Sequence, residues 1–225
     1  MTNPSRLVWI NRAQPGAAAT ANRVEAKGWT ALVAPLLEAR TLPNPTLDLT
    51  GIAALAFSSA QGVRAFAALT DARLPAFTVG DATAEAARAA GFTAVQSADG
   101  DVLALAELIA SARPGPILHA GALQPAGDLV GDLTARGLKA RTVALYETRS
   151  IEPTEALSRL PDITAVLVHS PKAAALLAAL LTARSAPHLR LLTLSEAVAA
   201  PLRALENPKI SVAPFPNEAS LLNLL

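Results

Sequence analysis

Cysteine does not occur among the 225 residues of this chain. Its absence excludes disulfides, thiol catalysis and the zinc or iron–sulfur sites that cysteine ligates. The three histidines, His119, His169 and His188, stand apart and have no HExxH context, so we expect no metal site. Aromatic residues make up only 4% of the chain, which argues against an electron carrier that stacks a flavin between aromatic rings.

A marked excess of charge of either sign is also missing. The chain has 19 Lys and Arg residues against 18 Asp and Glu, so no overall field would attract nucleic acid or a membrane surface. The longest strongly apolar run, residues 173–181, is about half of the ~20 residues that a membrane helix needs. The first apolar stretch is too short for the ~7–15-residue core of a signal peptide. We expect a soluble, cytoplasmic protein with neither nucleic acid nor membrane as a partner.

Hydrophobic residues are plentiful, at 52%, and they recur in one pattern. A short apolar strand runs into a turn of small residues and then into a helix. Short buried strands alternating with helices are typical of parallel sheets covered on both faces, so the sequence predicts an α/β protein. The predicted strands are residues 6–10, 29–34, 52–57, 75–79, 92–96, 116–120, 138–146, 164–170, 190–194 and 209–213.

Two segments interrupt this alternation and predict the domain organisation. Residues 36–48 contain two prolines and no helix, and residues 143–153 run extended as far as the proline at their end. The chain between them makes a complete α/β unit. We therefore predict two flavodoxin-like parallel-sheet domains, one inserted in the other, joined by a two-stranded linker beside a cleft. The outer domain is 1–36 and 150–225, the inserted domain is 43–144, and the linkers are 37–42 and 145–149.

A repeated phrase relates the two predicted domains. TVGDATAEAARAAG begins at position 78 and TLSEAVAAPLRALE at position 193, an offset of 193 − 78 = 115 positions. Ser195 stands in the place of Gly80, and Val198 in the place of Thr83. The outer domain thus resembles a circularly shifted copy of the inner one. We attribute the loss of Gly and Thr from one copy to a ligand that is not symmetric.

The turns between strands and helices are the candidate binding sites. In parallel sheets they lie at the carboxyl ends of the strands, where ligands bind, and their N–H groups and helix dipoles favour anions. The same small polar residues are also ordinary N-caps, each stabilising a helix by ~1 kcal/mol without any ligand, so both interpretations stay open for a single turn. The candidate turns are Asn11–Ala13, Ser58–Ala60, Gly80–Thr83, Ala120–Ala122, His169–Pro171 and Ser195–Glu196.

The usual catalytic motifs are absent. The chain has no Walker loop, GxGxxG motif or GxSxG elbow. Its one tyrosine, Tyr146, lies in the returning linker, where either its hydroxyl serves the site or its ring only packs. Trp9 and Trp29 lie in predicted strands and are assigned to the core.

Several of these phrases together resemble the uroporphyrinogen-III synthase family, from end to end of the chain. They are the Asn-Arg turn after the first strand (Thr-Arg-Pro in the family), Pro35, FSSAQGV (F-T-S-x-N-G-V), VGDATAEAARAAG (V-G-x-x-T-A with a closing Gly), VALYET (V-Y-x-T) and VLVHSPKAA (F-T-S-P). Their order and spacing make the resemblance specific. Departures from the family are Asn11 in the first motif, Gln61 in the second, and Ser195 as the one hydroxyl in the outer copy of G-x-x-T-A.

The resemblance implies a lyase that closes the linear tetrapyrrole hydroxymethylbilane to uroporphyrinogen III, with loss of water and inversion of the terminal pyrrole ring, in haem biosynthesis. It implies no metal or organic cofactor, and a monomer with at most a transient contact with the preceding enzyme of the pathway. Tyr146 would donate a proton to the departing hydroxyl, and Thr83 would help to position the substrate. The implied substrate-binding residues are Arg12, Ser58, Ser59, Gln61, Gly80, Ala120, Gly121, Ser170 and Ser195.

Two other functions stay open at this stage. A two-domain small-molecule binding or sensor protein without catalysis would share the architecture. The chain shows neither the signal peptide of periplasmic versions nor the helix-turn-helix of repressor versions. A flavodoxin-like electron carrier is the third possibility, opposed by the scarcity of aromatic residues.

Overall fold

The computed structural model describes residues 6–14, 16–184 and 186–225. The chain divides into two compact units, which we call the outer unit (residues 1–38 and 149–225) and the inner unit (residues 39–148). Residues 1–5, 15 and 185 of the predicted outer domain lie outside the described residues.

The outer unit contains a five-stranded sheet with the order β11-β10-β9-β1-β2, in which every neighbouring pair is parallel. Its elements are β1 (Leu7–Ile10), α1 (Gly16–Ala26), β2 (Thr30–Val33), α6 (Thr154–Ser158), the 3-10 helix η1 (Leu160–Asp162), β9 (Ile163–Val168), α7 (Pro171–Thr182), β10 (Arg190–Thr193), α8 (Glu196–Ala199), the 3-10 helix η2 (Ala200–Ala204), β11 (Lys209–Val212) and α9 (Glu218–Leu222).

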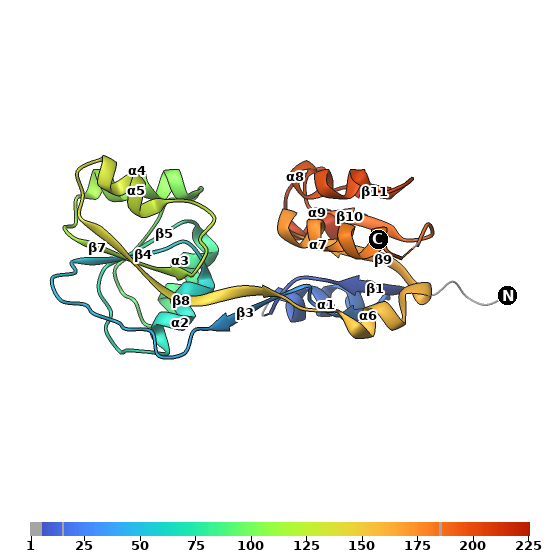
Figure 1. Cartoon of the computed structure of the whole chain (residues 1–225), viewed down its shortest axis with the longest axis horizontal. Helices are drawn as coiled ribbons and strands as arrows, with labels where there is room; N and C mark the ends of the chain where they lie inside the picture. The colour runs from blue at the N-terminus through green and yellow to red at the C-terminus, as the bar shows by residue number, and fades with distance from the viewer. Residues whose placement is uncertain (1–5, 15, 185) are drawn as a thin grey trace. The chain divides into compact units, whose positions relative to one another are not determined.

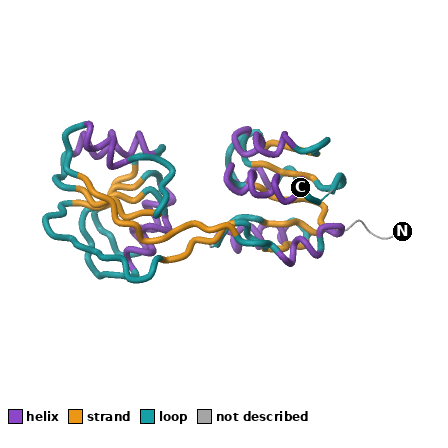
Figure 2. The backbone as a smooth tube through the Cα atoms, in the orientation of Figure 1, coloured by secondary structure: helices purple, strands orange, loops and turns teal. Residues whose placement is uncertain are grey.

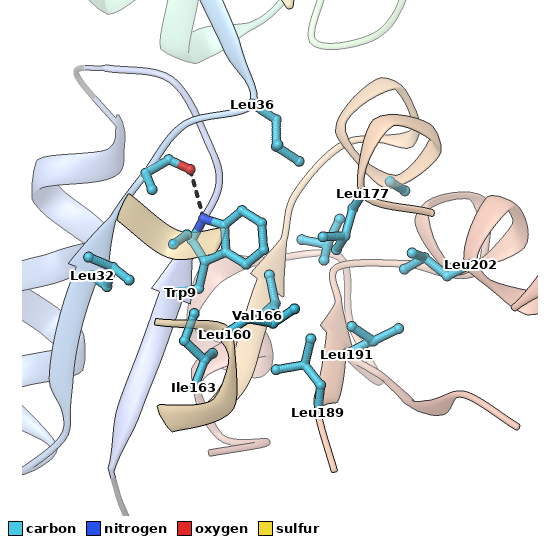
Figure 3. Packing of buried hydrophobic residues seen from close by; sticks show 14 of the residues in the cluster. Trp9, Leu32, Leu36, Leu160, Ile163, Val166, Leu177, Leu189, Leu191 and Leu202 are labelled. Atoms are coloured by element: carbon cyan, nitrogen blue, oxygen red, sulfur yellow. Dashed lines mark hydrogen bonds between the residues drawn. The ribbon is translucent and has the colours of Figure 1, made fainter. Parts of the chain in front are cut away.

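Helices cover both faces of this sheet because its central strands are apolar on both sides. Leu7 and Trp9 of β1 join one core cluster, whereas Val8 and Ile10 join the other, as the two-residue period of a strand requires. Figure 3 shows Trp9 surrounded by aliphatic side chains, among them Leu177 of α7. The buried indole Nε1 donates a hydrogen bond to the Ala34 carbonyl at 2.7 Å, so this polar group is satisfied inside the core.

The inner unit contains a six-stranded sheet with the order β3-β8-β7-β4-β5-β6 (Figure 1). Strands β4 to β8 pair in parallel. The elements are β3 (Leu37–Thr41), β4 (Ala54–Phe57), α2 (Ala60–Ala67), β5 (Ala76–Thr78), α3 (Asp81–Ala89), β6 (Val95–Ser97), α4 (Val102–Ala112), β7 (Ile117–Ala122), α5 (Leu129–Ala135) and β8 (Ala140–Ser150). The α/β class with parallel sheets is therefore confirmed.

Strands β3 and β8 carry the chain from one unit to the other and lie side by side (Figure 2). Leu42 N–H donates to the Leu145 carbonyl at 2.9 Å, and Ile151 N–H donates to the Leu36 carbonyl at 3.0 Å. These partners run in opposite sequence directions, so the two strands are antiparallel. The units divide a few residues away from the predicted domain ends because β3 and β8 each continue across the boundary.

Two predicted strands differ most from the observed ones. The strand predicted at 92–96 occupies 95–97, because Phe92 packs into the core before the strand begins. The strand predicted at 138–146 extends from 140 to 150, because β8 continues past its pairing with β7. Among the described residues, no helix combines the length and apolar character needed to cross a membrane.

Candidate active site

Each sheet has one pair of neighbouring strands from which the chain continues toward opposite edges of the sheet. In the outer sheet this switch point lies between β1, which leads to β2, and β9, which leads to β10 and β11. In the inner sheet it lies between β4, which leads to β5 and β6, and β7, which leads to β8. The loops after such a pair of strands diverge, and ligands of α/β proteins bind at that point. Seven of the eleven predicted site residues either follow β1, β4 or β9 or lie on β7.

Tyr146 and Ser59 meet at the inner switch point. Tyr146 Oη lies 2.7 Å from Ser59 Oγ, although 87 positions separate them in the sequence. Ser59 is the N-cap of α2, and its Oγ accepts the Gly62 N–H at 3.1 Å. Ser59 can then donate its single proton to the phenolic oxygen, which leaves the proton of Tyr146 free to reach another acceptor.

A β-bulge sets the direction of the Tyr146 side chain. β8 pairs residue by residue with β7 as far as Gly121, and Tyr146 then pairs with Ala122, so that Leu145 is the extra residue. Leu145 and Tyr146 are consequently both buried, and Leu145 enters the core of the inner unit. Bulges of this kind redirect side chains beside functional sites. The tyrosine thus belongs to a paired strand of the inner unit.

Ser58 contacts a histidine that the sequence did not assign to the site. Ser58 Oγ lies 3.0 Å from Nε2 of His119 on β7. His119 is 2% exposed, and burial lowers the pKa of its imidazole from 6.5, so the ring is neutral at neutral pH. A Cβ atom at position 121 would lie 2.9 Å from Nε2. Gly121 therefore leaves room for the ring.

Helix α2 approaches β7 at Gly62. A Cβ atom there would lie 2.6 Å from the Ala120 carbonyl oxygen, closer than real Cβ atoms come. The glycine thus allows the N-terminus of α2 to reach the end of β7. The structure in this way brings together five predicted site residues, Ser58, Ser59, Ala120, Gly121 and Tyr146. Gln61 behaves differently, because its Oε1 accepts hydrogen bonds from Arg64 on the same helix at 3.0 and 3.2 Å.

The repeated phrase adopts the same local geometry in both units. Thr83 N–H donates to the Gly80 carbonyl at 3.0 Å, and Val198 N–H donates to the Ser195 carbonyl at 3.1 Å. Gly80 and Ser195 are both extended N-cap residues without a side-chain cap bond. Thr83 is 6% exposed and Val198 is 3% exposed. A Cβ atom at position 80 would meet nothing within 4 Å, so the space beside Gly80 is open.

Arg12 lies in a cluster at the outer switch point. Its Nη1 is 3.1 Å from Glu218 Oε2, and His169 Nε2 is 3.0 Å from the same oxygen. Thr20 Oγ1 donates to Glu218 Oε1 at 2.5 Å. A Cβ atom at Gly16 would come within 2.5 Å of the Arg12 guanidinium, so the glycine lets the Arg12 side chain lie across the start of α1.

Glu218 is the common partner of this cluster. Its partial burial raises the pKa, but hydrogen bonds from His169 and Thr20 and the nearby charge of Arg12 outweigh that effect and lower the pKa of Glu218 to about 2. The carboxylate is therefore ionised at neutral pH, and its oxygens can only accept hydrogen bonds.

The two remaining predicted residues are N-caps in the outer unit. Ser170 Oγ accepts the Ala173 N–H at the start of α7 at 3.2 Å. Ser195 precedes the short helix α8. Both lie at the carboxyl ends of strands, as predicted from the turns. Within residues 6–14, 16–184 and 186–225, no group of three or more His, Cys, Asp or Glu side chains could hold a metal ion.

Sequence reasoning gave no individual role to five residues of these clusters: Asn11, Thr20, His119, His169 and Glu218. Asn11 and His169 were included in turns predicted as candidate binding sites, and both histidines were recognised as isolated in the sequence. No local signal pairs any of them with its partner, because the partners come from distant strands and helices. The order of strands in each sheet is the information that would have found them.

Comparison with known proteins gives one family. The sequence model of the family described as uroporphyrinogen-III synthase HemD matches residues 18–223. No curated protein sequence matches the chain significantly. A uroporphyrinogen-III synthetase structure from Helicobacter pylori is similar with a TM-score of 0.68 and 18% identity, over 97% of this chain and 96% of that one. A mutant uroporphyrinogen III synthase structure from the extremely thermophilic bacterium Thermus thermophilus gives 0.56 and 20%, over 96% of both chains. At these identities the structures support the fold.

Proposed function

The chain belongs to the uroporphyrinogen-III synthase family, and on this premise we propose the function of its site: it closes hydroxymethylbilane to uroporphyrinogen III, with inversion of the terminal pyrrole ring and loss of water. The enzyme is a cyclising lyase of porphyrin and haem biosynthesis. The observation that carries this conclusion is the family match over residues 18–223. It does not favour a binding or sensor protein without catalysis.

The chemistry requires control of geometry more than activation. Hydroxymethylbilane loses its hydroxyl and closes spontaneously, but to the isomer in which the last ring is not inverted. The enzyme must hold the two end rings so that the terminal ring attacks through its substituted carbon and forms a spiro intermediate. Orientation of this kind contributes up to about 7–11 kcal/mol in favourable cases.

Tyr146 is the residue that we propose as the proton donor to the departing hydroxyl. A phenolic hydroxyl has one proton to donate and can also accept a hydrogen bond, and Ser59 can accept the Gly62 N–H while it donates to the phenolic oxygen. In this arrangement Ser59 holds the Tyr146 ring in place, and the phenolic proton goes to the substrate. Such a donor contributes roughly 10²–10⁴-fold to the rate.

The other site residues are proposed to bind the acetate and propionate groups of the substrate. Backbone N–H groups at helix N-termini are suitable partners for carboxylates. Thr83 adds a positioning hydroxyl in the inner unit, and Arg12 supplies a cation in the outer unit. The proposed binding residues are Arg12, Ser58, Ser59, Gln61, Gly80, Ala120, Gly121, Ser170 and Ser195.

We also propose that both units are flavodoxin-like domains of common origin, one inserted in the other. The outer strands, numbered along the chain, follow the order 2-1-3-4-5, which is the flavodoxin order. The order β8-β7-β4-β5-β6 of the inner sheet matches it when the chain is counted from β7. This relation supports the circular shift suggested by the repeated phrase. A cytoplasmic monomer, with at most a transient contact with the preceding enzyme, completes the proposal.

Incubation of the purified protein with hydroxymethylbilane tests the function. The product is oxidised and its isomers are separated, with a sample without protein as the control. We expect the inverted type III isomer in excess over the spontaneous type I isomer. Formation of type I alone, at the rate of the control, would contradict the proposal, and tight binding without type III formation would favour the sensor protein.

A further inference from the structure

Three buried side-chain atoms at the outer switch point have no hydrogen-bond partner. They are Nδ2 and Oδ1 of Asn11 and Nδ1 of His169, and no other buried side-chain nitrogen or oxygen of the described residues lacks one. Asn11 is 0% exposed, and the His169 side chain is 8% exposed. Most buried polar atoms in proteins are paired, because an unpaired one destabilises the folded state. Their concentration on two residues therefore calls for a physical reason.

These two residues flank the crevice of the outer sheet. Asn11 directly follows β1 and His169 directly follows β9. The strands are parallel neighbours, and Ile10 at the end of β1 pairs with Leu167 near the end of β9. The strand ends diverge here, as at every switch point, and the place between them is where α/β proteins bind ligands. The unpaired atoms thus coincide with the expected ligand position.

The contact with Glu218 determines what His169 can offer a ligand. Because the carboxylate of Glu218 only accepts hydrogen bonds, the His169 Nε2 at 3.0 Å must carry a proton and donate it. In the neutral ring Nδ1 is then an acceptor. A carboxylate that holds an imidazole in one tautomer and orientation is a recurrent arrangement in functional sites.

We propose that Asn11 and His169 form a substrate subsite that holds one pyrrole ring, with the pyrrole N–H donating to His169 Nδ1 and an acidic side chain of the same ring bound by Asn11 Nδ2 and Arg12. Glu218 is the positioning residue for His169. This assignment rests on the proposed function. Arg12 is the most exposed member of the cluster, with a side chain that is 36% exposed against 17% for Glu218 and 8% for His169.

The chemistry of the group matches that of a pyrrole with a carboxylate substituent. Such a ring offers one N–H donor and one anion. The cluster offers an imidazole acceptor, an amide that both donates and accepts, and a guanidinium. The contacts of Arg12 with Thr20 and Glu218 among the described residues both use Nη1. A guanidinium carries five N–H donors, so donors on Nη2 and Nε can take a carboxylate of the substrate.

Two substitutions of His169 test the roles of its two ring nitrogens separately. In His169→Gln the amide nitrogen reaches the position of Nε2 and keeps the contact with Glu218, but the acceptor at Nδ1 is lost. In His169→Asn the side-chain oxygen lies near the position of Nδ1 and the contact with Glu218 is lost. We expect KM for hydroxymethylbilane to rise about tenfold or more in His169→Gln, as for the loss of one buried hydrogen bond, with kcat little changed. KM should rise less in His169→Asn than in His169→Gln, because the acceptor near Nδ1 is kept although the contact with Glu218 is lost.

The matched control is His188→Gln, because His188 lies in the same unit and its Nε2 lies 3.3 Å from the Leu160 carbonyl oxygen, outside the Glu218 cluster. Its KM should not change. Equal KM values in both His169 variants, raised or unchanged, would overturn the role of Nδ1. Nuclear magnetic resonance of the histidine nitrogens in the free protein checks the tautomer independently of activity, and a proton on Nδ1 in the neutral ring would also overturn it.

Asn11→Leu distinguishes a ligand subsite from a site for a buried water. Leucine has a similar shape and removes two unpaired polar atoms, so the melting temperature should rise or stay the same. If Asn11 binds substrate, KM should rise together with this gain in stability. An unchanged KM would mean that Asn11 binds at most a buried water molecule, and it would contradict the proposed subsite. The unaltered protein is assayed in parallel. If it forms no type III product, the result contradicts the proposed function and not the Asn11–His169 subsite.

Discussion

The Oη atom of Tyr146 lies 2.7 Å from the Oγ atom of Ser59, and this contact joins strand β8 to the N-terminus of α2. Ser59 holds the helix through the Gly62 N–H and the tyrosine through its hydroxyl. The same serine therefore has a structural role as the N-cap of α2 and a proposed catalytic role as the hydrogen-bond partner of Tyr146. Substitution can separate the two.

Tyr146→Phe removes the phenolic hydroxyl and keeps the ring. We expect kcat to fall by roughly 10²–10⁴-fold, the usual contribution of a general acid, while KM and the melting temperature change little. Steady-state assays with isomer analysis measure both constants. A loss of about tenfold or less would indicate that orientation dominates and that the tyrosine is not the acid.

Ser59→Ala removes the cap of α2 and the partner of Tyr146 together. We expect a loss of stability of about 1 kcal/mol from the cap and a decrease in kcat, because the Tyr146 hydroxyl loses its fixed orientation. Asp101→Ala is the control, since Asp101 caps α4 through the Leu103 and Ala104 N–H groups away from the tyrosine. That variant should lose similar stability and keep its kcat. Equal activities in the two variants would contradict the role of Ser59.

Thr83→Val makes the inner turn match Val198 of the outer copy. The fold should tolerate this change, because valine already occupies the same local geometry in the outer unit. We expect a higher KM and a larger share of the non-inverted isomer, as poorly held substrate closes spontaneously. Thr134→Val on α5, whose hydroxyl donates to the Val130 carbonyl in an exposed position, is the control. An isomer ratio identical to that of the unaltered protein would exclude Thr83 from the site.

Glu218→Gln should change how stability depends on pH. The pKa of Glu218 is about 2 in the folded chain, against an ordinary value of 4.5 for a glutamate carboxyl group. A carboxyl with a lowered folded pKa stabilises the protein above 4.5, and this contribution is lost as the pH falls from 4.5 towards 2. The variant should therefore be less stable than the unaltered protein at pH 7, and the difference should shrink near pH 3. Urea unfolding at both pH values measures it, and a constant difference would contradict the lowered pKa.

The sequence by itself determined the α/β class and the family. Apolar strands of a few residues, alternating with helices, leave parallel sheets as the arrangement that buries both faces. The family followed from phrases in a fixed order, and the family match over residues 18–223 confirms it. Local patterns were sufficient here because strand propensity, turn chemistry and caps act within a few positions of the chain. The assignment of site residues remains a prediction.

Only the tertiary structure decided which polar side chains meet. Arg12 contacts Glu218 across 206 positions, and Ser58 contacts His119 across 61. These pairs depend on the order of strands in each sheet and on the bulge that redirects Tyr146. Strand order is set by how whole helices cover both faces of the sheet, a property of the complete chain. No short segment of sequence carries that information, which is why Asn11 and His169 gained a role only once β1 and β9 were seen side by side.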